Sequence, residues 1–313
     1  MGTQVKEEQK KCVEGIIFDI MRYAIHDGPG VRTTIFMKGC PLRCLWCHNP
    51  EGISSANDLA YFDYKCISCK TCAKFCPTKA IIFDGNKHII NRDICTMCGI
   101  CAELCPTGAL RIIGRTISVK ELMMAIEKDI ILYETSGGGV TFSGGEPLFQ
   151  PLFLKEAVKE CKNRKIHVAL DTSGYAQPDV FRSVAKQVDL FLYDLKLLND
   201  HEHLKYTGVS NKLILKNLIF LVEEGRGKDV IIRFPVIPYI TDTDENIMRL
   251  LELFRQLKGV EEVNLLPFHD VREKYLRIGK KYFMSIHDVP AEDRLMYIKG
   301  KFEETGLRVK IGG

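Results

Sequence analysis

Three closely spaced cysteines are the residues of this sequence that most clearly point to chemistry. Cys40, Cys44 and Cys47 lie in segment 38–50, which reads KGCPLRCLWCHNP. Four thiolates saturate a structural zinc ion or an iron–sulfur cube, whereas three leave one metal position open to a group that is not protein. The segment therefore predicts a metal centre at which a small molecule can bind and react.

A second set of cysteines forms an internal repeat. Residues 66–81 read CISCKTCAKFCPTKAI and residues 95–110 read CTMCGICAELCPTGAL, so each copy has the spacing C-x2-C-x2-C-x3-C-P. Two-cluster bacterial ferredoxins have this spacing, and in them the fourth cysteine of each copy binds the other cluster. A pair of zinc sites is the alternative. The predicted ligand sets are Cys66, Cys69, Cys72 and Cys105 for one [4Fe-4S] cube, and Cys95, Cys98, Cys101 and Cys76 for the other.

The composition limits the class of protein. The chain has 313 residues, 46% hydrophobic content and a net charge of +4 from 44 basic and 40 acidic residues. It has no long basic run, so we expect no nucleic acid partner. We see no signal peptide, and no apolar stretch reaches the roughly 18 residues that cross a membrane. The 13 cysteines therefore indicate metal binding rather than disulfides, in a cytoplasmic protein without a membrane partner.

Short apolar runs alternate with amphipathic segments over most of the chain. Such alternation indicates a parallel sheet with helices outside, and six units favour a partial barrel over a closed eight-stranded one. Buried strands are predicted at 33–37, 140–143, 168–171, 190–195, 230–234 and 263–266. Helices are predicted near 118–133, 148–164, 178–187, 211–224 and 243–257.

The positions of the repeat and of the strands predict the domain organisation. We expect an α/β fold, a partial (β/α)6 barrel, interrupted by a ferredoxin-like α+β insert. The insert has little apolar core of its own, so its fold should depend on its clusters. The predicted parts are an N-terminal tail at 1–14, the barrel at 15–57 and 116–313, and the insert at 58–115.

Polar or metal-binding residues follow every predicted strand. In parallel α/β sheets, the residues just beyond the carboxyl ends of the strands form the active site. Each of these residues alone could simply cap a turn, but their occurrence after six strands predicts one common site. In chain order the positions are Cys40, Cys44 and Cys47; Gly144, Gly145 and Glu146; Asp171, Thr172 and Ser173; Asp194 and Lys196; Arg233; and His269.

Two segments together resemble a known family. Segment 28–50, GPGVRTTIFMKGCPLRCLWCHNP, and segment 143–147, SGGEP, are similar to the radical S-adenosylmethionine (SAM) enzymes that activate glycyl radical enzymes. The resemblance extends over nearly the whole chain from about Gly15. The repeat makes the chain similar to the subgroup that activates decarboxylases, dehydratases and lyases, rather than to the shorter pyruvate formate-lyase activase.

The resemblance implies a reaction that uses the open metal position. The amino and carboxylate groups of SAM would chelate the open iron of a [4Fe-4S] cube held by Cys40, Cys44 and Cys47. One electron, from a donor such as flavodoxin or ferredoxin, would cleave SAM into methionine and a 5′-deoxyadenosyl radical. That radical would take hydrogen from a glycine of a partner glycyl radical enzyme and leave as 5′-deoxyadenosine. In all, the protein would hold three [4Fe-4S] clusters.

The resemblance also implies roles for single residues. Glu146 would accept the ammonium of SAM, with Gly144 and Gly145 allowing close approach, although such a pair is also typical of an ordinary turn. Trp46 would lie near the adenine or simply pack in the core. Lys196 would lie near the SAM carboxylate or the partner and act in catalysis. The other residues assigned to SAM are Cys47, His48, Asp171, Ser173, Asp194, Leu195, Arg233 and His269.

Two further features follow from the resemblance. Asp171, Thr172 and Asp194 would form a monovalent cation site, or else only hydrogen-bond to ribose or backbone. Where many relatives have Pro-Gly after the fifth strand, this chain has Pro238-Tyr239. Two other functions stay open from the residues alone: a radical SAM enzyme that acts on a small molecule, and an iron–sulfur electron carrier or redox sensor.

Overall fold

A mostly parallel sheet organises the protein. The computed structural model describes residues 13–284 and 289–312, so the predicted tail at 1–14 lies almost entirely outside the described residues. Nine strands form one sheet in the order β13-β12-β11-β10-β9-β8-β2-β1-β7. In chain order they are β1 (Glu14–Ala24), β2 (Arg32–Met37), β7 (Arg115–Ser118), β8 (Gly139–Gly144), β9 (His167–Thr172), β10 (Leu190–Asp194), β11 (Val230–Val236), β12 (Glu262–Pro267) and β13 (Arg308–Ile311).

The six predicted strands are confirmed as β2 and β8 to β12, which pair in parallel. Prediction missed three strands: β13, parallel to β12, and β1 and β7, which pair antiparallel. β1 is irregular, with two shifts in its register to β2 and several exposed positions, so it has no regular alternation of apolar residues. Strands β13 and β7 end the sheet, which is therefore open, as expected for a partial barrel.

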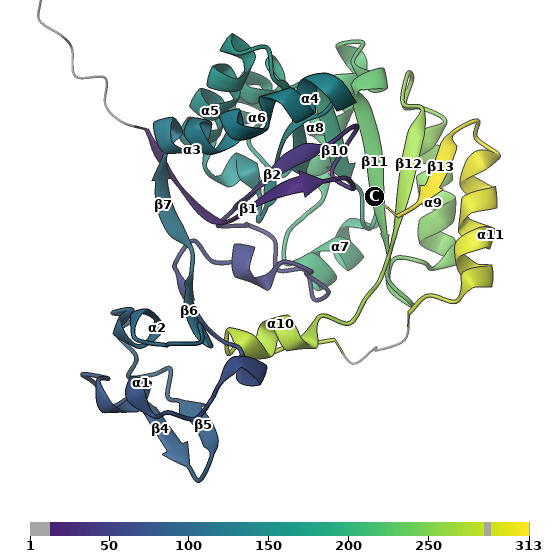
Figure 1. Cartoon of the computed structure of the whole chain (residues 1–313). Coiled ribbons are helices and arrows are strands. Elements are labelled where there is room, and N and C mark those ends of the chain that lie inside the picture. The colour runs from purple at the N-terminus through teal and green to yellow at the C-terminus, as the bar shows by residue number, and fades with distance from the viewer. Residues whose placement is uncertain (1–12, 285–288, 313) are drawn as a thin grey trace, which may run out of the picture.

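The helices form the outer layer of the fold (Figure 1). Every predicted helix is present, although segment 118–133 is divided between two helices; α7, α10 and α11 were not predicted. The helices of this part are α3 (Val119–Ile126), α4 (Ile130–Ser136), α5 (Pro151–Asn163), α6 (Pro178–Ala185), α7 (Asp200–Thr207), α8 (Lys212–Glu223), α9 (Asp244–Phe254), α10 (Arg272–Arg277) and α11 (Glu292–Glu303). No helix of the described residues is long and apolar enough to cross a membrane.

Alternation along the strands gives the sheet two different faces. On one face Phe142, Leu170 and Tyr193 belong to a single buried cluster that also includes apolar residues from most of the helices. Neighbouring residues on the strands, such as Asp171 and Asp194, point to the opposite face. The helices therefore cover one face of the sheet, and the other face is left to form a site.

Residues 58–113, called the insert below, lie outside the main sheet and project from the barrel (Figure 1). Strands β3 (Asp58–Tyr61) and β6 (Leu110–Ile113) pair antiparallel and connect the insert to the barrel. The rest consists of α1 (Thr71–Lys74), α2 (Ile100–Glu103) and the hairpin of β4 (Ile81–Asp84) and β5 (Lys87–Ile90). Its buried apolar cluster has only four members, Leu59, Ile81, Cys101 and Leu110, and the other buried apolar residues are the alanines Ala60, Ala80 and Ala109.

Candidate active site

The three-cysteine segment follows β2 and is held by backbone contacts on both sides. Cys40 donates its backbone N–H to the Ile53 carbonyl at 3.1 Å. Two side chains of α10 bind backbone carbonyls of the segment. Lys274 Nζ donates to the His48 carbonyl at 2.8 Å, and the Tyr275 hydroxyl donates to the Cys47 carbonyl at 3.1 Å. Helix α10 therefore helps to fix the segment, and no pattern in the sequence linked it to the cysteines.

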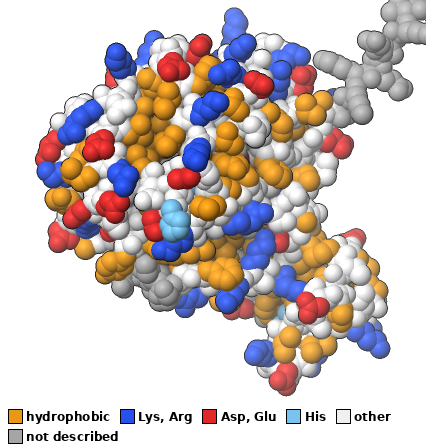
Figure 2. Space-filling view, turned by 180° about the vertical axis from the view of Figure 1, so that it is seen from behind, with side chains coloured by type: hydrophobic (Ala, Val, Ile, Leu, Met, Phe, Trp, Pro, Cys, Tyr) orange, Lys and Arg blue, Asp and Glu red, His pale blue; other side chains and the backbone are white. Residues whose placement is uncertain are grey.

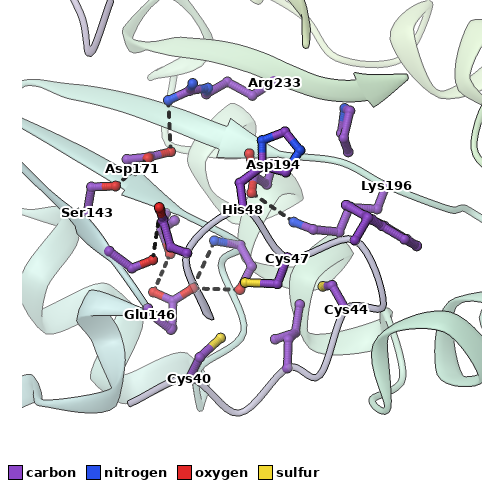
Figure 3. Close-up of a pocket in the computed structure, with 18 of the residues that line it drawn as sticks. Cys40, Cys44, Cys47, His48, Ser143, Glu146, Asp171, Asp194, Lys196 and Arg233 are labelled. Carbon is purple, nitrogen blue, oxygen red and sulfur yellow. Dashed lines mark hydrogen bonds and ion pairs between the residues drawn. The ribbon is translucent and has the colours of Figure 1, made fainter. Parts of the chain in front are cut away.

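All three cysteines line one large pocket, together with the ends of β8, β9, β10 and β11. Figure 3 shows the three sulfur atoms on one side of this pocket, with Glu146 near them, and Asp171 and Arg233 on the other side. About 940 Å³ of the pocket is free of protein atoms, counting the part open to solvent. The predicted site residues that line it are Cys40, Cys44, Trp46, Cys47, His48, Gly144, Gly145, Glu146, Asp171, Thr172, Ser173, Asp194, Lys196 and Arg233.

The chemistry of the three thiols fits metal binding. Burial raises the pKa of Cys40, Cys44 and Cys47 to about 12, so a metal that takes them as thiolates must displace their protons. Among the described residues, no three His, Cys, Asp or Glu side chains converge closely enough to hold a single metal ion. An iron–sulfur cube needs no such convergence, because each cysteine binds a different corner.

Glu146 is buried and already has four hydrogen-bond donors. Its carboxylate accepts from the Thr172 hydroxyl at 2.7 Å, from the Ser173 hydroxyl and N–H at 2.6 and 2.8 Å, and from the Leu148 N–H at 3.1 Å. Burial raises its pKa, and these hydrogen bonds oppose that rise. The carboxylate therefore holds the loops after β8 and β9 together, in addition to any contact with a ligand.

The two glycines before Glu146 are required by the backbone itself. A Cβ on Gly144 would lie 2.4 Å from the Met37 nitrogen, and one on Gly145 would lie 2.4 Å from the Gly39 carbonyl oxygen. Gly145 donates to the Met37 carbonyl at 2.8 Å. The glycines therefore allow the loop after β8 to pack directly against the start of the three-cysteine segment.

Two ion pairs cross the pocket. Arg233 Nη1 lies 3.3 Å from Asp171 Oδ1, and Ser143 donates to the other Asp171 oxygen at 2.6 Å. Lys196 Nζ lies 2.8 Å from Asp194 Oδ2, and the Lys196 side chain is 8% exposed. Burial opposes the charge of Lys196, but Asp194 and the nearby cysteines raise its pKa. A monovalent cation at these carboxylates would have to displace a side-chain cation.

The aromatic and imidazole residues are divided between the pocket and its surroundings. His48 lines the pocket; burial, His269 and Lys274 lower its pKa to about 4, and its buried Nε2 has no hydrogen-bond partner among the residues that the structure describes. His269 does not line the pocket, but its ring lies 6.1 Å from that of His48. Trp46 both lines the pocket and packs in a small apolar cluster. The Leu195 side chain lies in the helix-facing core instead.

Several lining residues escaped prediction. Asn49, which donates to the Gly144 carbonyl at 3.4 Å, directly follows the predicted His48, and Ser143 opens the motif before the two glycines. Their positions next to the two motifs could have identified Asn49 and Ser143 as pocket residues. The others contribute apolar surface, which gives no signal in a single sequence: Leu42, Pro235, Ile237 and Leu266.

The insert contains two smaller cavities, each lined by four cysteines. Each cavity has space free of protein atoms, about 330 Å³ in one and about 350 Å³ in the other. The four cysteines of each cavity are the members of one predicted crossed ligand set. The sets are Cys66, Cys69, Cys72 and Cys105 in the first cavity, and Cys76, Cys95, Cys98 and Cys101 in the second.

Comparisons with known proteins identify the family. The model of the radical SAM superfamily matches residues 34–251. The chain is 43% identical over 302 residues to the trans-4-hydroxy-L-proline dehydratase activating enzyme of Clostridioides difficile, covering 95% of this chain and 99% of the relative.

Two further relatives are similar over most of their length. The (2S)-3-sulfopropanediol sulfolyase activating enzyme of Bilophila wadsworthia is 39% identical over 286 residues, 90% of this chain and 94% of the relative. The choline trimethylamine-lyase activating enzyme of Oleidesulfovibrio alaskensis is 40% identical over 276 residues, which cover 86% of this chain and 88% of the relative. The chain belongs to the radical SAM superfamily and, within it, to the activating enzymes of glycyl radical enzymes.

Proposed function

We propose that this protein activates a partner glycyl radical enzyme by cleaving SAM in the pocket beside Cys40, Cys44 and Cys47. One observation carries the proposal: the three thiols and two partly buried ion pairs line the same cavity. A [4Fe-4S] cluster there would supply the electron that cleaves SAM to methionine and the 5′-deoxyadenosyl radical. The radical would then take hydrogen from a glycine of the partner.

Several pocket residues would bind and orient SAM. Lys196 and Arg233 are the cations of the pocket wall, so we assign them to the SAM carboxylate or to the partner segment. His48 is neutral, and its unpartnered Nε2 would bond to a polar group of the nucleoside. Trp46 would pack against the adenine. Asp171, Asp194 and Ser173 offer acceptors for the ammonium and ribose, since Glu146 is largely occupied by protein donors.

The insert would hold two more [4Fe-4S] clusters, which makes three in the protein. Support comes from the two cavities, because each gathers the four cysteines of one crossed set. The small apolar core of the insert agrees with a fold that depends on its clusters. We accordingly propose a barrel made of residues 15–57 and 116–313 and a ferredoxin-like unit at 58–115.

The partner enzyme is chosen for a first assay by similarity. The relative with 43% identity activates trans-4-hydroxy-L-proline dehydratase, so that enzyme is the first glycyl radical enzyme to be tested. Choline trimethylamine-lyase and (2S)-3-sulfopropanediol sulfolyase follow, because relatives that activate them are 40% and 39% identical. A low-potential flavodoxin or ferredoxin would supply the electron.

Anaerobic activation tests the proposal. The protein, loaded with clusters, is incubated with SAM, a reductant and each candidate partner. We expect a glycine-centred doublet in the electron paramagnetic resonance (EPR) spectrum of one partner, with 5′-deoxyadenosine formed in proportion. Cleavage of SAM that yields a modified small molecule and no protein radical would favour a small-molecule enzyme instead. Absence of SAM cleavage would leave only the electron carrier.

A further inference from the structure

The two copies of the cysteine repeat differ in charge. In the first copy and the residue before it, lysines stand at four positions where the second copy has none. These are Lys65, Lys70, Lys74 and Lys79, aligned with Ile94, Gly99, Glu103 and Gly108. The segment 64–83 contains no acidic residue at all. The two copies can therefore be compared directly, because their cysteines have the same spacing and the charge of the neighbouring residues differs.

At two of these positions the backbone conformation disfavours a lysine. Lys70 and Lys79 have φ values of 59° and 55°, in the left-handed region that favours glycine. The aligned residues of the second copy are glycines with φ values of 83° and 64°. The first copy therefore carries a lysine at two positions where the backbone favours glycine and the second copy has glycine.

One of these lysines lines the first cavity of the insert, and two others lie close in sequence to its cysteines. Lys70 lines the cavity beside Cys69, and both side chains are exposed. Lys70 is the N-cap residue of α1, and the exposed Lys74 ends that helix. Lys65 directly precedes Cys66. Figure 2 shows several Lys or Arg side chains on the insert, which lies at the lower right of that view.

Exposed apolar residues lie among these lysines. Tyr64, Ile67 and Phe75 are 68%, 65% and 51% exposed. A mixture of cations and exposed apolar side chains is typical of a protein interface. A surface of this composition fits a partner whose own surface is acidic.

The two cavities lie at different steps of the ladder that connects the insert to the barrel. Strand β3 begins at Asp58, which pairs with Ile113. The second cavity is lined by Leu59 and Ile112 at the next step of this ladder, and the first by Tyr61 and Leu110 at its other end. The first cavity therefore lies away from the two chain connections to the barrel, while Phe62 beside it contacts Arg277 of α10.

We propose that Lys65, Lys70 and Lys74, with the exposed Cys69, form the docking surface for a small acidic electron-transfer protein. The donor is oxidised by one electron, and the cluster held by Cys66, Cys69, Cys72 and Cys105 is reduced by one electron. The inference rests on the proposed function, since it requires a cluster in this cavity. To the proposed function, the inference adds the site at which the electron enters the protein and the residues that recognise the electron donor.

Charge reversal tests the docking surface. The double variant Lys70→Glu/Lys74→Glu is compared with Lys186→Glu/Lys216→Glu, which makes the same charge change at exposed positions on the barrel. The probe is a fully reduced acidic flavodoxin, and stopped-flow absorbance follows its oxidation by the cluster-loaded enzyme. At low ionic strength we expect a second-order rate constant about 10 to 100 times lower for the insert variant only, with the difference shrinking as salt is added.

Two controls separate docking from other effects. Photoreduced deazaflavin, a neutral reductant, should reduce both variants at the wild-type rate, and the cluster potentials should be unchanged. The variant Lys70→Gly, which removes the charge and the strain together, should slow the flavodoxin reaction about threefold to tenfold without lowering the melting temperature.

Three results would overturn the inference. Unchanged flavodoxin kinetics in an iron-replete charge-reversal variant would overturn the docking surface alone. Slower reduction by deazaflavin, or a shifted cluster potential, would mean that the lysines tune the cluster instead. A wild-type enzyme without iron in its insert would overturn both this inference and the cluster assignment on which it rests.

Discussion

The three-cysteine segment of the barrel and the repeat of the insert use the same ligand in opposite surroundings. In the pocket, the thiols share their walls with Asp171, Arg233 and Lys196, and all of these groups are buried or half-buried. In the second cavity of the insert the lining includes no charged side chain besides the cysteines themselves. The pocket thus offers charged groups for a polar molecule beside a metal, whereas the second cavity offers only thiols and uncharged side chains.

The two regions also differ in what supports them. The pocket lies on a sheet whose other face is the large apolar core of the barrel. The insert has a buried apolar cluster of only four residues and exposes apolar side chains such as Ile67 and Ile82. A region with so little core needs another source of free energy, and metal binding can provide it.

The strongest test of the comparison removes one ligand from each region. Cys44→Ala should lower SAM cleavage to below about one thousandth of the wild-type rate, because the cluster that binds SAM is lost. Cys98→Ala, the matched change in the insert, should leave cleavage with a chemical reductant within about tenfold. Chromatography of 5′-deoxyadenosine and iron analysis check both variants. Equal loss of cleavage would show that the pocket does not act as a separate centre.

Removal of iron should affect the stability of the insert much more than that of the barrel. Chelation of iron should raise hydrogen-exchange rates in β4 and β5 by about 10³-fold or more, since the insert loses the clusters that order it. Exchange in β10 and β11 should change little. Mass spectrometry of peptides from the loaded and metal-free protein measures this, and a metal-free insert that stays protected would contradict the proposed dependence.

The fold could be predicted where apolar residues are regularly spaced. Strands β8 to β12 are nearly continuous apolar runs, as parallel buried strands require. Helix α7 was missed because the segment 200–207, DHEHLKYT, has only a weak apolar face. Helix α10 is short and has a single buried residue, Tyr275, so its role in holding the three-cysteine segment arises from tertiary contacts alone.

Acid should weaken the barrel through an ion pair between the buried Asp129 and the exposed Arg22. Asp129 accepts hydrogen bonds from Arg22 and from the Thr33 hydroxyl, and chiefly the bond from Arg22 lowers its pKa. A carboxyl whose pKa is lowered by folding stabilises the protein above its unfolded pKa of about 3.9, and this stabilisation disappears as the pH falls through the folded value.

Asp129→Asn should therefore reduce the free energy of barrel unfolding by about 2 kcal/mol at pH 7 and by progressively less below about pH 4. Urea unfolding of the metal-free protein at several pH values measures the difference. Glu245→Gln, in an exposed pair with Arg249, is the control and should change the free energy by less than about 0.5 kcal/mol. A constant difference at all pH values would argue against the Asp129 carboxylate as the titrating group.

The charged wall of the pocket should matter for SAM affinity. Lys196→Gln leaves Asp194 without its cation, so we expect the Kd for SAM to rise about 10- to 100-fold, or about 1.4 to 2.8 kcal/mol. Equilibrium dialysis with the cluster-loaded enzyme measures the affinity. Lys162→Gln breaks a pair with Asp189 outside the pocket and should leave the Kd within about twofold. An unchanged Kd for Lys196→Gln would remove this residue from the SAM site.

The sequence allowed us to predict that the site lies at the carboxyl ends of the strands. It did not allow us to predict which side chains contact one another within the site. Spacing along the sequence identified Glu146 as a pocket residue without showing that Thr172 and Ser173 already occupy its oxygens. Tyr239 illustrates the same limit at the level of backbone. Its φ of 63° lies in the left-handed region that favours glycine, and no pattern along the sequence predicted that conformation for a tyrosine.

The smallest expected effect concerns strain within the insert. Lys79 has a φ of 55° where the second copy has Gly108, so Lys79→Gly should stabilise the cluster-loaded insert by about 0.5 to 1 kcal/mol. Lys74→Gly removes the same charge from α1, where glycine is unfavourable, and should destabilise the insert by up to about 1 kcal/mol. Denaturant midpoints from cluster absorbance compare the two. If both variants move in the same direction, charge and not backbone strain distinguishes the two copies at this position.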